Sequence, residues 1–123
     1  MAAALSPDFV YDAVVLEVHD GDTITVDVDL GFHVHYRTPV RLLGCNAREL
    51  AQPGGPEARD HLKAVLPVGT AVVLGSAKTD KFARWDATVE VAGADLVSAL
   101  IADHWAASWD GNGLKPIPPW PRP

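Results

Sequence analysis

The architecture expected for this chain follows from the stretch HDGDTITVDVD, His19 to Asp29. Its Asp-Gly pair is a strong signal for a tight connection between two antiparallel strands. After the pair the sequence alternates, so that Ile24, Val26 and Val28 share one face of an extended strand and polar residues share the other. A hairpin whose second strand is half-buried is therefore predicted. The turn does not explain Asp22, which stands where the strand should already have begun.

The strands that flank this stretch are predicted from the same alternation. Residues 14–18 form the first strand of the hairpin, and residues 32–44, FHVHYRTPVRLLG, return as a long third strand. Pro39 cannot donate a backbone hydrogen bond, so we expect a bulge or bend there. The following residues, 45–55, are loop-like. The first part of the chain is therefore expected to contain three antiparallel strands.

A helix and two more strands are predicted next. Residues 55–66, GPEARDHLKAVL, predict a helix, because Gly55 can cap it and Pro56 suits its first position. The apolar residues of this segment recur at helical spacing and form one stripe. Residues 70–77 and 85–91 are rich in β-branched residues and predict the fourth and fifth strands.

The last helix completes the expected fold. Residues 95–106 predict a helix with Asp95 as its N-cap. Three strands, a helix, two strands and a helix fit an α+β, mainly β fold, namely a five-stranded OB-type Greek-key β-barrel with two helices. We expect this domain to span residues 1–111. Residues 112–123 form a proline-rich tail, which is predicted to lie extended.

Length and composition suit a single domain without membrane spans. The chain has 123 residues, of which 48% are hydrophobic, enough for one core. No apolar run approaches the roughly 18 residues of a membrane span. The N-terminus has no basic segment followed by an apolar one, so we expect no signal peptide and a cytoplasmic protein. Cys45 is the only cysteine, which excludes an intrachain disulfide, and we expect it to be a small core residue.

Charge is distributed unevenly along the chain. The formal net charge is −6, which taken alone argues against a nucleic-acid-binding protein. Residues 1–36 contain seven acidic residues and no Lys or Arg, whereas residues 37–84 contain eight Lys or Arg and four acidic residues. Residues 85–123 carry five acidic and two basic residues. The middle of the chain can therefore present a phosphate-facing surface, or simply a mixed, solvated one.

Four short motifs follow one another in the chain: DGDT at 20–23, RLLGCNARE at 41–49, GPEA at 55–58 and TDKFAR at 79–84. Together, and in this order, they resemble the staphylococcal nuclease (thermonuclease) family, which has a DGDT turn, an RL strand with a PE loop, a GPEA helix start and a TDKYGR connection. The resemblance runs from about residue 14 to residue 107. The NA-x-E loop and the WDGNG…PPWP ending also resemble, more weakly, small nuclease-like proteins of actinobacterial phages.

The resemblance implies an enzyme that hydrolyses phosphodiester bonds of DNA or RNA with little sequence specificity. By position, Arg41 would contact the scissile phosphate, Glu49 would orient or deprotonate the attacking water, and Arg84 would stabilise the transition state. Lys81 would lie near the terminal phosphate of the nucleotide. These residue types suit the chemistry, because arginine binds two phosphate oxygens at once and a carboxylate can take a proton from water.

The resemblance also implies a Ca²⁺ site, with Mg²⁺ or Mn²⁺ as alternative ions. Asp22 would be the carboxylate ligand, and the side chain of Asn46 and the carbonyl of Ala47 would complete the set, since calcium prefers oxygen ligands. The family has an aspartate where this chain has Asn46, so we expect weaker calcium binding. Arg48 stands where the family has proline, and this cation would either repel calcium or bind phosphate.

Other interpretations stay open beside the enzyme. The chain can be a catalytically weak or inactive nuclease-like module that binds nucleic acid or protein, or an assembly protein that docks through its tail. Asp20 suits a turn, and His33 and His35 suit a solvated strand face. Of the four tryptophans, we expect only Trp120 at the surface, where it would help the tail to pack back onto the barrel.

Overall fold

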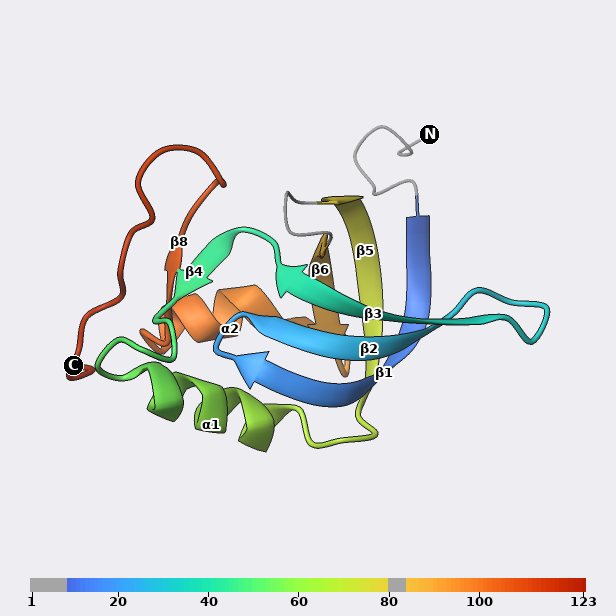
Figure 1. Cartoon of the computed structure of the whole chain (residues 1–123), viewed down its shortest axis with the longest axis horizontal. Helices are drawn as coiled ribbons and strands as arrows, with labels where there is room; N and C mark the ends of the chain where they lie inside the picture. Colours follow the sequence, from blue (N-terminus) through green and yellow to red (C-terminus); the bar gives the residue numbers. More distant parts are fainter. Residues whose placement is uncertain (1–8, 80–83) are drawn as a thin grey trace.

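A computed structural model gives the fold and describes residues 9–79 and 84–123 (Figure 1). The elements within these residues are, in chain order, β1 (Phe9–Asp20), β2 (Thr23–Asp29), β3 (His35–Leu42), β4 (Cys45–Ala47), α1 (Gly55–Val65), β5 (Ala71–Thr79), β6 (Trp85–Val91), β7 (Ala94–Asp95), α2 (Leu96–Ala102) and β8 (Ala106–Ser108). The five longer strands correspond to the five predicted ones. β4, β7 and β8 are short additions.

The five longer strands close into a barrel. β1 pairs with β2 and with β5, β2 pairs with β3, and β5 pairs with β6, all antiparallel. A short parallel pairing between β3 and β6, from Val40 with Trp85 to Leu42 with Ala87, joins the two ends of this series. The mixed five-stranded barrel with two helices confirms the predicted α+β, OB-type fold.

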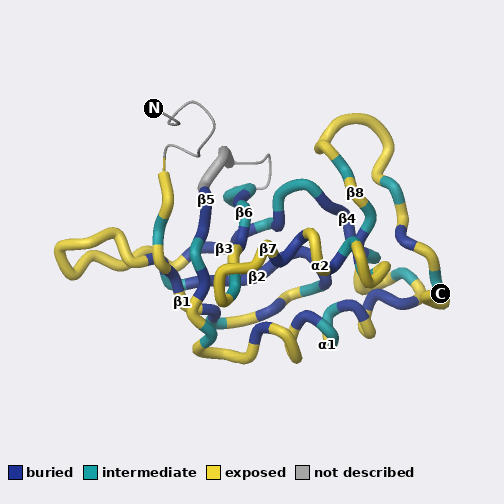
Figure 2. The backbone as a smooth tube through the Cα atoms, turned by 180° about the vertical axis from the view of Figure 1, so that it is seen from behind, coloured by how far each residue is buried: buried dark blue, intermediate teal, exposed yellow. Residues whose placement is uncertain are grey.

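Apolar side chains from the barrel strands fill its interior, and both helices add to this core. Val15, Val26 and Val89 are fully buried, as is Leu62 of α1, and Leu100 of α2 is 3% exposed. α1 packs along β1, and α2 packs against β6 and β8. Figure 2 shows buried backbone running through the strands and an exposed tip on the β2–β3 hairpin.

The prediction that β2 is half-buried is wrong for its first residues. Thr23 and Thr25 are buried along with the apolar residues between and after them. The second face of the strand is covered because Arg84 Nη1 contacts the hydroxyl of Thr23 and His19 Nε2 lies 2.6 Å from the hydroxyl of Thr25. Alternation returns only near the end of the strand, where Asp29 is exposed.

The bulge expected at Pro39 is absent from the described strand pairing. β2 and β3 keep one register from Asp29 opposite His35 to Thr23 opposite Arg41. Pro39 is exposed, and the pairing of β3 with β6 begins only at the next residue. A proline fits there without distortion, because only one neighbouring strand pairs with that position.

The segment predicted as a loop after β3 contains a strand. Cys45 to Ala47 form β4, which pairs antiparallel with β8 (Figure 1). The second predicted helix is correspondingly shorter: α2 has Asp95 as its N-cap, as predicted, but ends at Ala102. The residues after it turn back to make β8. Two segments that are distant in sequence therefore lie side by side, and they bring the chain's C-terminal part to the loop after β3.

The start of α1 holds the loop that carries Glu49. The N-cap is Gly54, with a φ of 84°, rather than the predicted Gly55. A side chain at Gly55 would place its Cβ 1.8 Å from the carbonyl oxygen of Glu49. The loop and the helix start therefore touch through their backbones, which requires glycine.

Cys45 is fully buried, which confirms its predicted core position. Burial raises the pKa of its thiol to about 12, with a further contribution from the charge of Asp22. No helix among the described residues is long and apolar enough to span a membrane.

Candidate functional site

A buried carboxylate, that of Asp22, lies at the centre of the candidate site. Only 8% of the residue is exposed. Its Oδ2 accepts hydrogen bonds from the backbone N–H of Ala47 at 3.0 Å and from Nη2 of Arg41 at 3.4 Å. Its Oδ1 accepts from the hydroxyl of Thr23 at 3.2 Å. The aspartate that the turn could not explain therefore joins β2, β3 and β4.

The turn before Asp22 is shaped by the residues packed around it. Oδ1 of Asp20 accepts a hydrogen bond from the backbone N–H of Asp22 at 3.0 Å, the turn role predicted for it. A side chain at Gly21 would place its Cβ 2.8 Å from Cβ of Ala47 and 3.0 Å from Cβ of Ala58. Glycine lets β4 and α1 approach the turn this closely, so the DGD sequence fixes the position of the carboxylate.

The surroundings of Asp22 raise the pKa of its carboxyl from 3.8 to about 6. Burial is the largest cause, because the charged form loses hydration. The charge of Asp20 adds to the rise, whereas the N–H of Ala47 and the guanidinium of Arg41 lower the pKa. Strong perturbation of a titratable group by burial and specific charges is typical of functional sites.

Arg41 connects the carboxylate to the loop after β3. Its side chain is 12% exposed, and its Nη2 donates both to Asp22 and, at 3.3 Å, to Oδ1 of Asn46. The guanidinium carbon lies 5.2 Å from the ring centre of Trp109, within cation–π range. The prediction that Trp109 belongs to the core is therefore wrong. The β4–β8 pairing carries it to the site instead.

Arg84 reaches the same cluster from the segment before β6. Its Nη1 donates to Oγ1 of Thr23 at 3.5 Å, and the Thr23 hydroxyl donates to Asp22. Two arginines from separate segments thus flank one carboxylate, Arg41 directly and Arg84 through a threonine. Lys81, predicted to bind phosphate nearby, lies outside the described residues.

Glu49 lies at the edge of the cluster. Its side chain is 63% exposed, and its Oε1 is 3.8 Å from Nζ of Lys115. That ammonium lies 5.8 Å from the ring centre of Trp109, the ring that Arg41 also contacts. The carboxylates of Glu49 and Asp22 are therefore both connected, each through a cation, to one indole.

The tail, residues 112–123, lies over the loop that carries the predicted metal and phosphate residues. Nδ2 of Asn46 donates to the carbonyl of Pro116 at 2.9 Å. Nε of Arg48 donates to the carbonyl of Pro118 at 3.0 Å, and its Nη1 donates to the carbonyl of Pro53 at 3.1 Å. Arg48, predicted to meet either calcium or phosphate, thus binds backbone carbonyls.

Calcium needs several oxygen ligands around one point. The two side-chain oxygens predicted to hold it, on Asp22 and Asn46, both accept from the same nitrogen of Arg41. A cationic group therefore already stands between them. Within residues 9–79 and 84–123, no group of three or more His, Cys, Asp or Glu side chains could hold a metal ion. Calcium binding by Asp22 and Asn46 would therefore require Arg41 to move.

The site brings together most, but not all, of the predicted residues. Asp22, Arg41, Asn46 and Ala47 share direct hydrogen bonds, Arg84 joins through Thr23, and Arg48 and Glu49 turn toward the tail. Sequence reasoning did not find Trp109, Lys115 or the buried Thr23. The only sequence signal for the first two was the resemblance of the WDGNG…PPWP ending, which carried no residue roles.

A second feature, at the barrel mouth, was not predicted. A cavity of about 330 Å³ lies among β1, β2, β3, β5 and β6, with Phe9, Tyr11, Tyr36 and Trp85 in its wall. No charged side chain of the described residues lines it. It is a separate, apolar space that contains none of the predicted site residues.

A comparison of the sequence with protein-family models finds none that matches, and a comparison with curated proteins finds no match either. The class that the fold defines is a small OB-like barrel with two helices. The likeness to the staphylococcal nuclease family therefore rests on the four sequence motifs alone.

Proposed function

We propose that the chain is a small nuclease-like phosphodiesterase that acts on DNA or RNA with little sequence specificity. The observation that carries the proposal is the convergence of Arg41 and Arg84 on the buried carboxylate of Asp22. These residues come from three of the four motifs. A packed core has no need for two arginines and an acid at one spot, because burying them costs free energy.

The chemistry assigned to this chain follows from those side chains. A phosphodiester is anionic, so attack by water requires positive charge at the phosphate oxygens and a group that takes the proton of the water. Arg41 and Arg84 supply the guanidinium groups, and Arg41 would exchange its bonds to Asp22 and Asn46 for bonds to phosphate. Glu49, whose side chain is exposed, would accept the proton. The family resemblance adds in-line attack opposite the 5′-oxygen, which leaves 3′-phosphate ends.

The test of this proposal is a cleavage assay on single- and double-stranded DNA and RNA, in EGTA or with added Ca²⁺, Mg²⁺ or Mn²⁺. Calcium dependence stays a prediction, and the metal arms of the assay decide it. Replacement Glu49→Gln should lower turnover by more than about 100-fold, the scale of losing a general base. Glu57→Gln is the matched control, because Glu57 is an exposed acid in the first turn of α1.

Full turnover by the Glu49→Gln variant would remove Glu49 from the mechanism. Absence of cleavage by the unmodified chain, under every metal condition, would refute the proposed phosphodiesterase activity. The second candidate, a nuclease-like binding module without turnover, would then be favoured by the ion pair that engages Glu49 and by the hydrogen bonds that engage Arg41. Binding of an oligonucleotide without digestion is the result that it predicts.

A further inference from the structure

The tail occupies hydrogen-bonding groups that a nucleic acid would need. Asn46 Nδ2, on β4, and Arg48 Nε, directly after β4, donate to carbonyls of the tail. Lys115 of the tail also stands against Glu49. These three contacts involve residues 46–49, next to the pair of Arg41 and Asp22 that Asn46 joins.

Between Pro116 and Pro119 the tail has four backbone carbonyls and a single backbone N–H, that of Ile117. Prolines have no backbone N–H, so a proline-rich strip can offer only carbonyl oxygens along much of its length. The carbonyls that face the site belong to Pro116 and Pro118, two residues apart. At the roughly 3.1 Å rise of an extended proline-rich strand, they repeat every ~6 Å. Two carbonyl oxygens of the tail therefore stand opposite one amide donor and one guanidinium donor.

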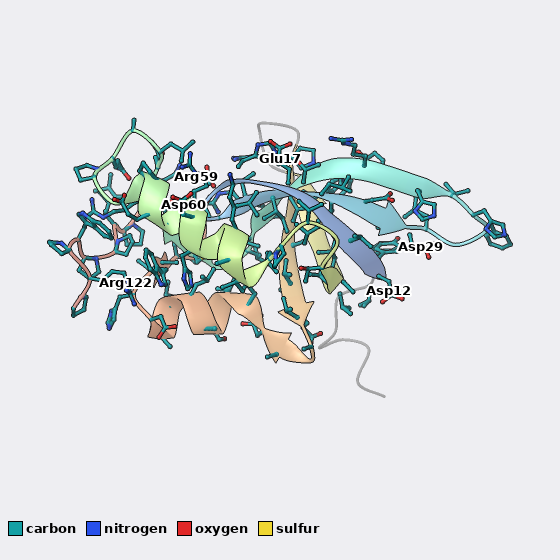
Figure 3. All side chains as sticks on the ribbon, turned by 90° about the horizontal axis from the view of Figure 1, so that it is seen from below. Asp12, Glu17, Asp29, Arg59, Asp60 and Arg122 are labelled. Carbon is teal, nitrogen blue, oxygen red and sulfur yellow. The ribbon has the colours of Figure 1, made fainter. Side chains whose placement is uncertain are left out.

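The far end of the tail is anchored at the start of α1 and at the end of α2. The indole of Trp120 lies on the backbone of Gly54, where an added Cβ would come within 2.4 Å of the ring. Arg122 donates from Nε to the carbonyl of Asp103 at 3.0 Å and stacks 4.1 Å from the ring of Trp105. Figure 3 shows Arg122 beside the C-terminal end of α2. Trp120 touches the helix start that holds the loop of Glu49, whereas Arg122 binds only the end of α2 and Trp105.

We propose that the tail is an intramolecular competitor, whose carbonyls hold the positions that phosphate oxygens take when nucleic acid binds. The inference rests on the proposed function, because it assumes that this site binds a phosphodiester chain. Nucleic acid must displace the tail, so the apparent affinity is the intrinsic affinity multiplied by the fraction of molecules with the tail released. Weakening the anchor raises that fraction and therefore the affinity.

The experiment measures binding of a fluorescent, phosphorothioate-linked oligonucleotide to the full chain by anisotropy, in EGTA and at one salt concentration. Trp120→Ala should lower the Kd by at least about tenfold, the expected gain when a state populated at 10% or less becomes dominant. Trp120→Phe keeps an aromatic ring on Gly54 and should bind like the unmodified chain. Circular dichroism and thermal melting confirm that each variant is folded.

A second variant, Arg122→Gln, keeps the inference testable if Trp120→Ala does not fold. Loss of a cation by itself would weaken binding to an anionic chain. Tighter binding by this variant would therefore come from release of the tail. Lys63→Gln, an exposed cation in the last turn of α1, is the charge-matched control and should bind no more tightly.

The outcomes separate the two proposals. Tighter binding by both anchor variants, with no cleavage of unmodified DNA or RNA in the assay with added metals, supports the competing tail and refutes the nuclease. Cleavage by the unmodified chain, with no gain in affinity for folded anchor variants, supports the nuclease and refutes the competing tail. If neither the unmodified chain nor the variants bind any oligonucleotide, and the unmodified chain cleaves none with any metal, both proposals are overturned.

Discussion

Replacing Asp22 with asparagine is expected to stabilise the fold at neutral pH. The carboxylate is buried, and its pKa rises from 3.8 to about 6, chiefly through burial and then through the charge of Asp20. The N–H of Ala47 and the guanidinium of Arg41 already act against the rise, so the net pKa includes their favourable contacts. The charged form of Asp22 is therefore a net cost to the folded state.

The size of this cost follows from the two pKa values. Their difference is about 2, and each unit corresponds to about 1.36 kcal/mol, so ionised Asp22 lowers the free energy of unfolding by about 3 kcal/mol. Because the folded pKa is raised, the stability contribution is fully present below pH 3.8 and is lost as pH rises through about 6. Asparagine has no such loss, so its advantage should be complete above pH 6.

Asparagine can also keep the local hydrogen bonds. Its amide oxygen can accept from the N–H of Ala47, as Oδ2 of Asp22 does, and its NH₂ can donate to the Thr23 hydroxyl, which rotates to accept. The assay is urea unfolding at pH 7.5 and at pH 4. We expect the variant to be more stable by about 3 kcal/mol at the higher pH and by less than about 1 kcal/mol at the lower.

Asp12→Asn is the matched control, because Asp12 is an exposed aspartate on β1. It should change the free energy of unfolding by no more than about 0.5 kcal/mol. The reasoning is refuted if Asp22→Asn is no more stable than the unmodified chain at pH 7.5. It is refuted equally by a gain of the same size at pH 4, since such a gain would not come from ionisation.

Two further predictions follow from buried or partly buried titratable groups. His61 stacks on Trp105 with ring centres 4.5 Å apart, and burial, followed by the charge of Arg122, lowers its pKa. As pH falls below the ordinary histidine pKa of 6.5, His61 takes up a proton more readily in the unfolded chain, so its contribution to stability should be lost. His61→Phe should therefore flatten the dependence of the melting temperature on pH between 5 and 7. Cys45, whose pKa is raised to about 12, should resist Ellman's reagent in the folded protein and react fully in urea, and rapid labelling without urea would contradict its burial.

Elements governed by local pattern could be predicted from the sequence. The β-branched segments at β5 and β6 lie where the pattern placed them, because both strands contribute alternate side chains to the core. The Asp95 cap was predicted for the same kind of reason: its carboxylate accepts from the N–H of Ser98 within one turn. The burial of Thr23 was not predictable, because it depends on Arg84, which no local pattern places over it.

In the candidate site, too, some contacts could be predicted from the sequence and others could not. Asp22 and Arg41 lie in motifs, and their contact follows from the register that sets Thr23 of β2 opposite Arg41 of β3. The contacts of the tail could not be predicted, since the bonds from Asn46 to Pro116 and from Arg48 to Pro118 each join residues 70 positions apart. Extended proline-rich segments carry no periodicity that names a partner. Only the closed barrel and the β4–β8 pairing bring them together.

The strongest physical argument for a function at this site is that the charged carboxylate of Asp22 makes the fold less stable. A buried carboxylate breaks the rule that charges stay in water, and its raised pKa means that Arg41 and the N–H of Ala47 do not fully compensate for the lost hydration. An asparagine at position 22 would fit the same hydrogen bonds at lower cost. Buried charged residues that do not stabilise the fold occur mainly at functional sites. The acid at position 22 is therefore not explained by the stability of the barrel, which its charge lowers.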